Sequence, residues 1–137
     1  MYKNILVPVD LEHHEQVSKA LAVGGDLAKH YGAGITVVSV TMSGPSAVAR
    51  NPEEFETKLK QFVSEKSKEF GIPVSTKVMI SHDPTIDIDD VLQKAIAELN
   101  ADLVVMASHV PGAKEYVLAS RAGYLASHAG ISVMVVR

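Results

Sequence analysis

The sequence predicts an α/β protein in which helices cover both faces of a five-stranded parallel sheet. Five short apolar runs alternate along the chain with four longer segments whose apolar residues recur at helical spacing. Each helical segment is long enough to connect two parallel strands. Although 47% of the residues are hydrophobic, only 5% are aromatic. The core must therefore be built from aliphatic side chains, which suits packed layers of strand and helix.

The chain begins with a strand over residues 4–9, where the apolar run NILVPV carries its proline near the end, as a strand terminus favours. A helix is expected over 13–31, and Gly32 ends it. Gly24 and Gly25 lie in the middle of this helix, at a cost of about 1 kcal/mol each relative to alanine. Their presence there predicts close packing against a neighbouring element.

The second strand is expected over 35–41, where the sequence reads ITVVSVT. A helix over 52–70 follows, because Pro52 suits a first helical position and two carboxylates come next, near the positive end of the helix dipole. Residues 74–80 then alternate between apolar and polar side chains. That period of two predicts a half-exposed edge strand.

A loop at 81–84 leads into a third helix, expected over about 87–99 and capped by Asn100. The apolar run 103–106 predicts a strand buried on both faces. A loop of small residues follows this run, and a ligand site is expected there, because open α/β sheets bind ligands at the carboxyl ends of their strands. A fourth helix over 120–128 and a last strand over 132–136 complete the chain.

Composition excludes several function classes. We expect one domain over residues 1–137, with no linker and no internal repeat. The absence of cysteine excludes disulfides and thiolate metal sites.

No signal peptide and no run of 18 apolar residues is present, so we expect a cytoplasmic protein without membrane insertion. The net charge of −3, with scattered Lys and Arg, gives no nucleic-acid footprint. His13 and His14 indicate a solvated helix start rather than a metal site.

Three segments resemble the universal stress protein family. They are YKNILVPVD at 2–10, DLVVMASH at 102–109 and SHAGISVMVVR at 127–137. The resemblance covers the whole chain and implies a three-layer, doubly wound, flavodoxin-like sheet with strand order 3-2-1-4-5. It also implies a homodimer and, in many members, bound ATP.

The nucleotide-binding members carry G-x2-G-x9-G-[ST] after the fourth strand, and this chain departs from that pattern. Ala107, Val110 and Ala119 stand at the glycine positions, with one residue fewer in the second interval, and only Ser120 matches. Alanine disfavours positive φ by roughly 1 kcal/mol, and a β-branched residue there is an outlier. Gly112, two residues after Val110, can supply the positive φ that a phosphate-binding turn requires. Alternatively, Pro111-Gly112 is a simple turn between strand and helix with no role in binding.

The sequence fits better a branch of the family with Ala-Ser-His-x-Pro and Tyr-x-Leu-Gly-Ser, in which some members bind nucleotide. The matching residues are Ala107, Ser108, His109, Pro111, Tyr116, Leu118 and Ser120. A second departure is His82-Asp83-Pro84, which stands where the family has G-x-P. The 22 residues between Pro84 and Ala107 exceed the family's interval by about one helical turn. This insertion either extends the third helix or alters the dimer surface.

The resemblance places an adenine nucleotide at the ends of strands one, two and four. Val9 and Asp10 would flank the adenosine, and the backbone of Val40 would meet the base. Asp10 has a second interpretation as a helix cap. Arg121, which replaces a small or apolar residue, would either bind a phosphate or fill its place. The full predicted site is Pro8, Val9, Asp10, Val40, Met106, Ala107, Ser108, His109, Val110, Gly112, Ala119, Ser120 and Arg121.

We therefore expect a regulatory module that binds ATP or a related adenine nucleotide, with Mg²⁺ only alongside the nucleotide, little or no hydrolysis and an unidentified protein partner. The alternative is a dimeric adaptor of the same fold without nucleotide. An enzyme is disfavoured because G-x4-G-K-[ST], G-x-S-x-G and H-E-x-x-H are absent from the sequence. The last strand, 132–136, is apolar without Pro or charge, which predicts a homodimer along this edge.

Overall fold

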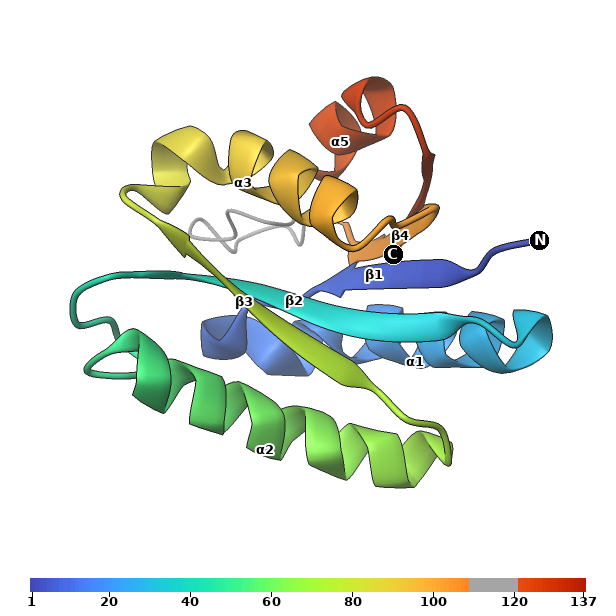
Figure 1. Cartoon of the computed structure of the whole chain (residues 1–137), viewed down its shortest axis with the longest axis horizontal. Coiled ribbons are helices and arrows are strands. Elements are labelled where there is room, and N and C mark those ends of the chain that lie inside the picture. The colour runs from blue at the N-terminus through green and yellow to red at the C-terminus, as the bar shows by residue number, and fades with distance from the viewer. Residues whose placement is uncertain (109–120) are drawn as a thin grey trace.

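The computed structural model describes residues 1–108 and 121–137, apart from the side chains of residues 13–17 and 85. Strands and helices alternate as the apolar pattern predicts (Figure 1). The strands are β1 (Asn4–Pro8), β2 (Gly34–Met42), β3 (Ser75–Ser81), β4 (Leu103–Ala107) and β5 (Ser132–Val136). The helices are η1 (Leu11–His13, a 3-10 turn), α1 (His14–Tyr31), α2 (Pro52–Phe70), α3 (Pro84–Glu98) and α5 (Ala122–His128).

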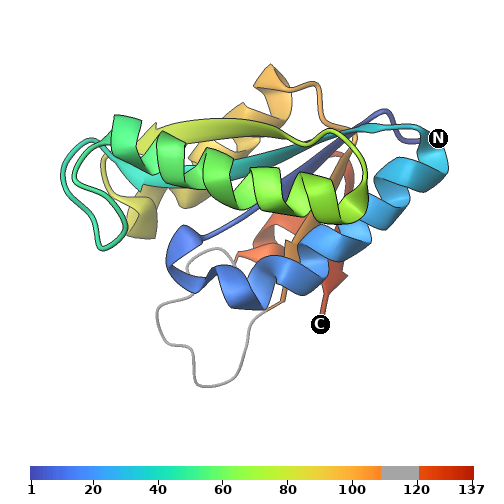
Figure 2. The same ribbon diagram turned by 90° about the horizontal axis from the view of Figure 1, so that it is seen from below.

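The five strands form one sheet in the order β3-β2-β1-β4-β5, and every neighbouring pair is parallel. This confirms the doubly wound α/β fold, and β3 is an edge strand as its alternating pattern predicts. Helices α1 and α2 cover one face, and α3 and α5 cover the other (Figures 1 and 2). The winding reverses between β1 and β4, which places their carboxyl ends side by side at the usual position of ligand sites in such sheets.

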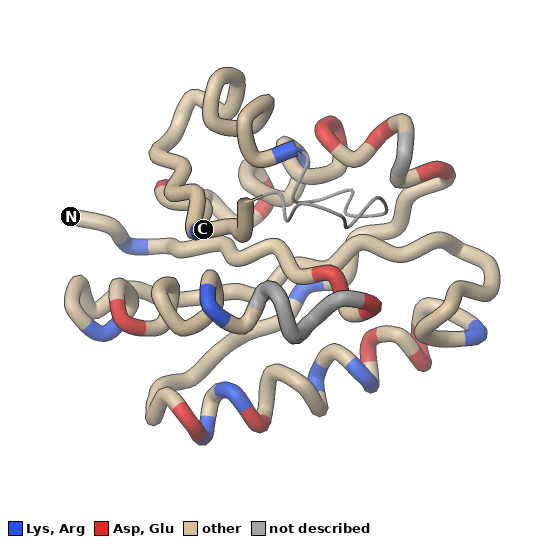
Figure 3. Tube along the Cα trace, turned by 180° about the vertical axis from the view of Figure 1, so that it is seen from behind, with Lys and Arg blue, Asp and Glu red and all other residues tan. Residues whose placement is uncertain are grey.

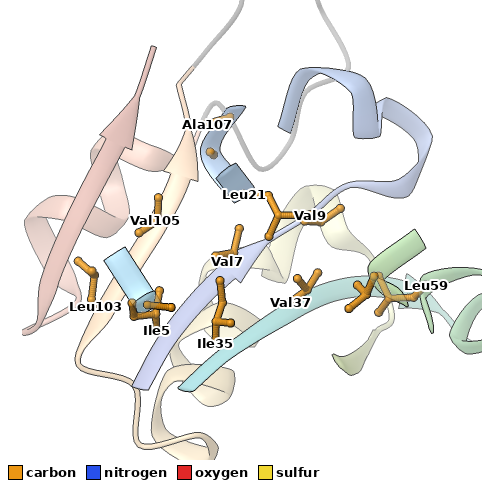
Figure 4. Close-up of a cluster of buried hydrophobic side chains, with 13 residues drawn as sticks. Ile5, Val7, Val9, Leu21, Ile35, Val37, Leu59, Leu103, Val105 and Ala107 are labelled. Atoms are coloured by element: carbon orange, nitrogen blue, oxygen red, sulfur yellow. The ribbon is translucent and has the colours of Figure 1, made fainter. Parts of the chain in front are cut away.

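Alternation along the strands divides the core into two layers. Ile5, Val7 and Val9 face α1 and α2 in a cluster with Leu21 and Leu59 (Figure 4). The intervening residue of β1, Leu6, faces the other side with Val38, Val104 and Met106, where it joins Ile88 and Leu92 of α3 and Leu125 of α5. Successive side chains of a strand point to opposite faces, so the two layers follow directly from the period of two.

The two glycines inside α1 confirm the expectation of close packing. A Cβ atom at Gly24 would lie 2.9 Å from Cγ2 of Val7, and one at Gly25 would lie 3.1 Å from the ring of Phe70. The first distance is shorter than real Cβ atoms show, and the second is tighter than most, so α1 packs closely on both β1 and α2. The helix therefore lies tightly beneath the strand that leads to the candidate site.

The third helix differs from its prediction. It begins at Pro84 rather than at residue 87 and ends at Glu98. The backbone carbonyl of Asp83 accepts hydrogen bonds from the backbone N–H groups of Ile86 and Asp87, each at 3.0 Å. Proline suits the first turn of a helix because its missing N–H would be unpaired there. The residue that we expected to end the loop thus begins the helix.

Other boundaries agree within one or two residues. Asn100 has a φ of 49°, as expected of a residue that follows a helix end. Helix α5 begins at Ala122, and Ser120, the first residue predicted for it, lies outside the described part, which resumes at Arg121. Within the described residues, no helix is both long and apolar enough to cross a membrane.

Candidate functional site

A cavity of about 170 Å³ lies at the carboxyl ends of β1 and β2. It brings together three residues that the sequence predicted for the site, Val9, Asp10 and Val40. The remaining lining residues come from the ends of η1 and β2, the following loop, and helices α2 and α3. They are Glu12, Thr41, Met42, Ser46, Ala47, Val48, Phe55, Pro84 and Ile88.

Val9 is held in place just beyond the end of β1. Its backbone N–H donates to the carbonyl of Val38 at 2.8 Å, and the hydroxyl of buried Ser39 donates to its carbonyl at 2.6 Å. Both backbone groups of Val9 are thus paired, and its side chain is fully buried. A wall fixed in this way needs no rearrangement to receive a ligand.

Asp10 follows Val9 and is half-buried. Its Oδ1 accepts a hydrogen bond from the backbone N–H of Glu12 at 3.0 Å. This is the helix-start role that the sequence left open for the residue. A carboxylate offers about four acceptor positions, so this bond and a place in the cavity wall are compatible.

The loop between β2 and α2 supplies a wall that sequence reasoning missed. The hydroxyl of Ser46 accepts from the backbone N–H groups of Val48 and Ala49 at 3.3 and 3.2 Å, and the Ser46 N–H donates to the Ala49 carbonyl at 2.8 Å. The Lys58 ammonium of α2 donates to the Val48 carbonyl. The available signal was Ser46 itself, since serine often bonds to the backbone two or three residues onward.

Helices α2 and α3 close the cavity with apolar groups. Phe55 and Ile88 are buried core residues that also line the cavity, and Pro84 lies beside them. At the start of α3, the Ser81 hydroxyl donates to Oδ1 of Asp87, which joins the end of β3 to the helix. The cavity is therefore largely apolar with a few oxygen atoms along its wall, a combination that suits a flat, partly polar ligand.

The other predicted residues do not line this cavity. Pro8 is buried in β1, and Met106 and Ala107 are buried at the end of β4. The backbone N–H of Ser108 donates to the Val136 carbonyl at 2.8 Å, which extends the pairing of β4 with β5 by one residue. Predictions for His109, Val110, Gly112, Ala119 and Ser120 lie outside the described residues.

Arg121 is in an ion pair with Asp89 of α3. Its Nη1 lies 3.5 Å from Oδ2 of Asp89, and both side chains are partly buried, with exposed fractions of 35% and 19%. Asp89 was not predicted as a site residue. The sequence showed it only within an acidic run that the helix dipole explains.

Charges near the cavity loop are arranged in pairs along α2. Oε2 of Glu54 lies 3.1 Å from Nε of Arg50, and its Oε1 lies 3.5 Å from Nζ of Lys58. The hydrogen bond from Arg50 holds the pKa of the Glu54 carboxyl below its ordinary value of 4.5. Acidic and basic residues are interspersed along this helix, at the bottom of Figure 3. Among the side chains that the structure describes, no group of three or more His, Asp or Glu is arranged to hold a metal ion.

Comparison with known proteins places these observations in a family. The family model described as "Universal stress protein family" matches residues 1–137. Universal stress protein G of Salmonella typhimurium is 29% identical over 146 residues, covering 100% of both chains. A universal stress protein in complex with cAMP is 15% identical, with a TM-score of 0.68 over 99% of this chain and 97% of the other.

A second solved structure, the universal stress protein of Archaeoglobus fulgidus in complex with dAMP, is 17% identical. Its TM-score is 0.68, over 99% of this chain and 98% of that one. At such identities these structures show a shared fold, and the match of the family model to the whole sequence shows kinship. The chain belongs to the universal stress protein family.

Proposed function

We propose that this protein is a regulatory module that binds an adenine nucleotide, ATP or a related one, with the adenosine in the cavity at the ends of β1 and β2. The observation that carries the proposal is the convergence of Val9, Asp10 and Val40 on one cavity. Two proteins of the same fold are in complex with cAMP and dAMP, which supports adenine nucleotides as the ligand class.

Adenine suits the apolar part of the cavity. Val9, Val40, Val48 and Phe55 line it and offer aliphatic and aromatic surface to the faces of a purine ring. Asp10 lies in the same wall, where its carboxylate accepts hydrogen bonds from ribose hydroxyls. Such an arrangement recognises a nucleoside by apolar burial and by one charged acceptor.

The phosphates are assigned to the neighbouring end of β4, because β1 and β4 are adjacent where the winding reverses. We assign them to residues outside the described part, namely His109, Val110, Gly112 and Ser120, because the backbone N–H of Ser108 is already paired with Val136. Mg²⁺ would enter only with the nucleotide.

Little or no hydrolysis is expected. Efficient phosphoryl transfer requires a positioned water, a bridging metal ion and a cation aimed at the developing charge. Among the described residues of the predicted site, only Asp10 and Arg121 have charged side chains that could serve these roles. Steady-state turnover of ATP should stay below about 1 per second, the low end for ordinary enzymes.

The alternative is a nucleotide-free adaptor that acts through a dimer surface. Two observations favour it. The cavity of about 170 Å³ is smaller than the roughly 300–1,000 Å³ typical of ligand pockets. Met134 and Val135 on the edge strand β5 are each 39% exposed. A protein partner would then recognise the dimer rather than a ligand state.

Filling the cavity distinguishes the two proposals. Ala47 lines the cavity and is exposed, so Ala47→Trp should place an indole in the base position without disturbing the core. We expect calorimetry to show AMP binding to the unmodified protein, at least tenfold weaker binding by the variant, and no change for Ala97→Trp on the exposed face of α3. If Ala47→Trp binds AMP as tightly as the unmodified protein, the adenine does not lie in this cavity. No binding of AMP or ATP at millimolar concentration would favour the adaptor.

A further inference from the structure

The ion pair between Asp89 and Arg121 joins the two elements that border the proposed phosphate position. Asp89 directly follows Ile88, which lines the cavity. Arg121 directly precedes Ala122, which packs in the same cluster as Met106 near the end of β4. The pair thus joins α3 to the residue that directly precedes α5.

This pair is incompletely satisfied. Its N···O separation is 3.5 Å, whereas charge-assisted hydrogen bonds measure roughly 2.7–2.9 Å. Oδ1 of Asp89 and Nε of Arg121 are both buried and have no hydrogen-bond partner among the described residues. Burying such atoms without a partner costs free energy that the long contact does not recover.

The length of this contact is shared by another ion pair, since Lys58 and Glu54 are also 3.5 Å apart, but two tighter pairs show the contrast. Lys77 and Glu98, which join β3 to α3, are 3.0 Å apart, and Lys60 and Glu56 on α2 are 3.1 Å apart. None of these four side chains has a buried polar atom without a partner. The Asp89–Arg121 pair instead has unused hydrogen-bonding capacity on both residues.

We propose that Arg121 is a phosphate-binding residue that makes the site prefer nucleotides over the unphosphorylated nucleoside, and that Asp89 holds its guanidinium and competes with the phosphate for it. This inference rests on the proposed function. Arginine binds phosphate best through two parallel N–H groups. The unpartnered Nε, together with an Nη, offers that pair of donors.

Asp89 gives the arrangement its selectivity. In the absence of an anion, its carboxylate keeps the guanidinium between α3 and α5. A phosphate competes with that carboxylate, so only a ligand that carries its own negative charge gains from Arg121. Adenosine has no such group, and its affinity should be independent of both residues.

The test compares AMP with adenosine by calorimetry on the full chain. Arg121→Met should weaken AMP binding about tenfold or more, as expected for loss of a charge-assisted pair of hydrogen bonds, and should leave adenosine unchanged. Arg121→Lys should retain part of the affinity for AMP.

Asp89→Asn, which keeps the oxygen but removes the charge, should strengthen AMP binding about threefold through reduced competition. In the double variant Arg121→Met/Asp89→Asn, that gain should disappear. Lys94→Met, which removes an exposed cation from α3, is the charge control and should change neither ligand.

The outcomes separate this inference from the proposed function. If adenosine and AMP both bind and Arg121→Met leaves their affinity ratio unchanged, the pair is only a structural tie, and the proposed function stands. If neither binds, the proposed function fails, and inorganic pyrophosphate then decides the inference. In an NMR titration, the Arg121 Nε–H resonance should shift when pyrophosphate is added. It should not shift with sodium chloride at the same ionic strength, and that contrast would support an anion site. No shift would overturn the inference as well.

Discussion

Asp10 combines a structural hydrogen bond with a place in the cavity wall. Its Oδ1 accepts from the Glu12 N–H at 3.0 Å, and the same residue lines the cavity. The bond positions the carboxylate, because it fixes the turn between β1 and α1. The sequence left the structural and the binding role open, and the proposed function uses both.

Two substitutions at Asp10 separate these roles. Asp10→Asn keeps an oxygen acceptor for the Glu12 N–H, so the free energy of unfolding should change by only a few tenths of a kcal/mol, whereas Asp10→Ala should lose about 1 kcal/mol. Both variants should bind AMP more weakly, because each loses the charged acceptor for ribose. Denaturant unfolding and calorimetry measure the two effects. If Asp10→Asn binds AMP as tightly as the unmodified protein, Asp10 has only the structural role of capping the helix start.

At the scale of elements, α2 and the loop before it form one unit at the cavity. Asn51 caps the helix by accepting from the Glu54 N–H at 2.8 Å, and Lys58 donates to the Val48 carbonyl. Glu54 contacts both Arg50 and Lys58. The position of the wall formed by Ser46, Ala47 and Val48 therefore depends on charges along the first turns of α2.

Acid should weaken this unit. Because Arg50 lowers the pKa of Glu54 below 4.5 in the folded protein, the contribution of the pair is complete above about pH 4.5 and is lost as pH falls through the folded pKa. An NMR titration of the Glu54 carboxyl should give a pKa below 4.5. Arg50→Gln should raise that pKa more than Lys58→Gln, and Lys60→Gln, which removes the partner of Glu56, is the control. A Glu54 pKa at or above 4.5 in the unmodified protein would contradict the assigned contacts.

The edge strand β5 is the proposed dimer interface. The Val136 carbonyl accepts from Ser108, so Val136 points its backbone groups toward β4, and alternation directs those of Val133 and Val135 toward the free edge. Val135→Pro should remove an outward N–H without disturbing β4. Sedimentation should show a dimer for the unmodified protein and for Val135→Ala at micromolar concentration, and a monomer for Val135→Pro. A monomeric unmodified protein would remove this interface, and a dimeric Val135→Pro would place it elsewhere.

For the molecule as a whole, local signals predicted the fold well. Helix α2 has the predicted bounds because its ends carry strong local signals: Asn51 and Pro52 at the start, and Gly71 with a φ of 70° at the end. Helix α3 was placed too late because Pro84 is compatible with both a loop and a first turn. The strand pairs followed from the alternation of elements, and their order from the family resemblance.

The candidate site was predicted only in part. Val9, Asp10 and Val40 were placed by the family resemblance, and the structure brings all three to one cavity at the carboxyl edge of the sheet. Ala47 and Phe55 were missed because the folding of a loop and the tilt of a helix bring them to the cavity, and neither leaves a local pattern. The partner of Arg121 was missed for the same reason, since Asp89 lies on a different helix.

The central claim is that adenosine occupies the cavity at the ends of β1 and β2, and intermolecular NOEs between AMP and methyl-labelled protein test it most directly. We predict NOEs from the adenine H2 and H8 protons to the methyl groups of Val9, Val40 and Val48, which all line the cavity. Val133, on β5 at the far side of β4 from β1, should show none. If millimolar AMP gives no NOE to these three valines, or gives NOEs only to methyl groups elsewhere, the account is contradicted.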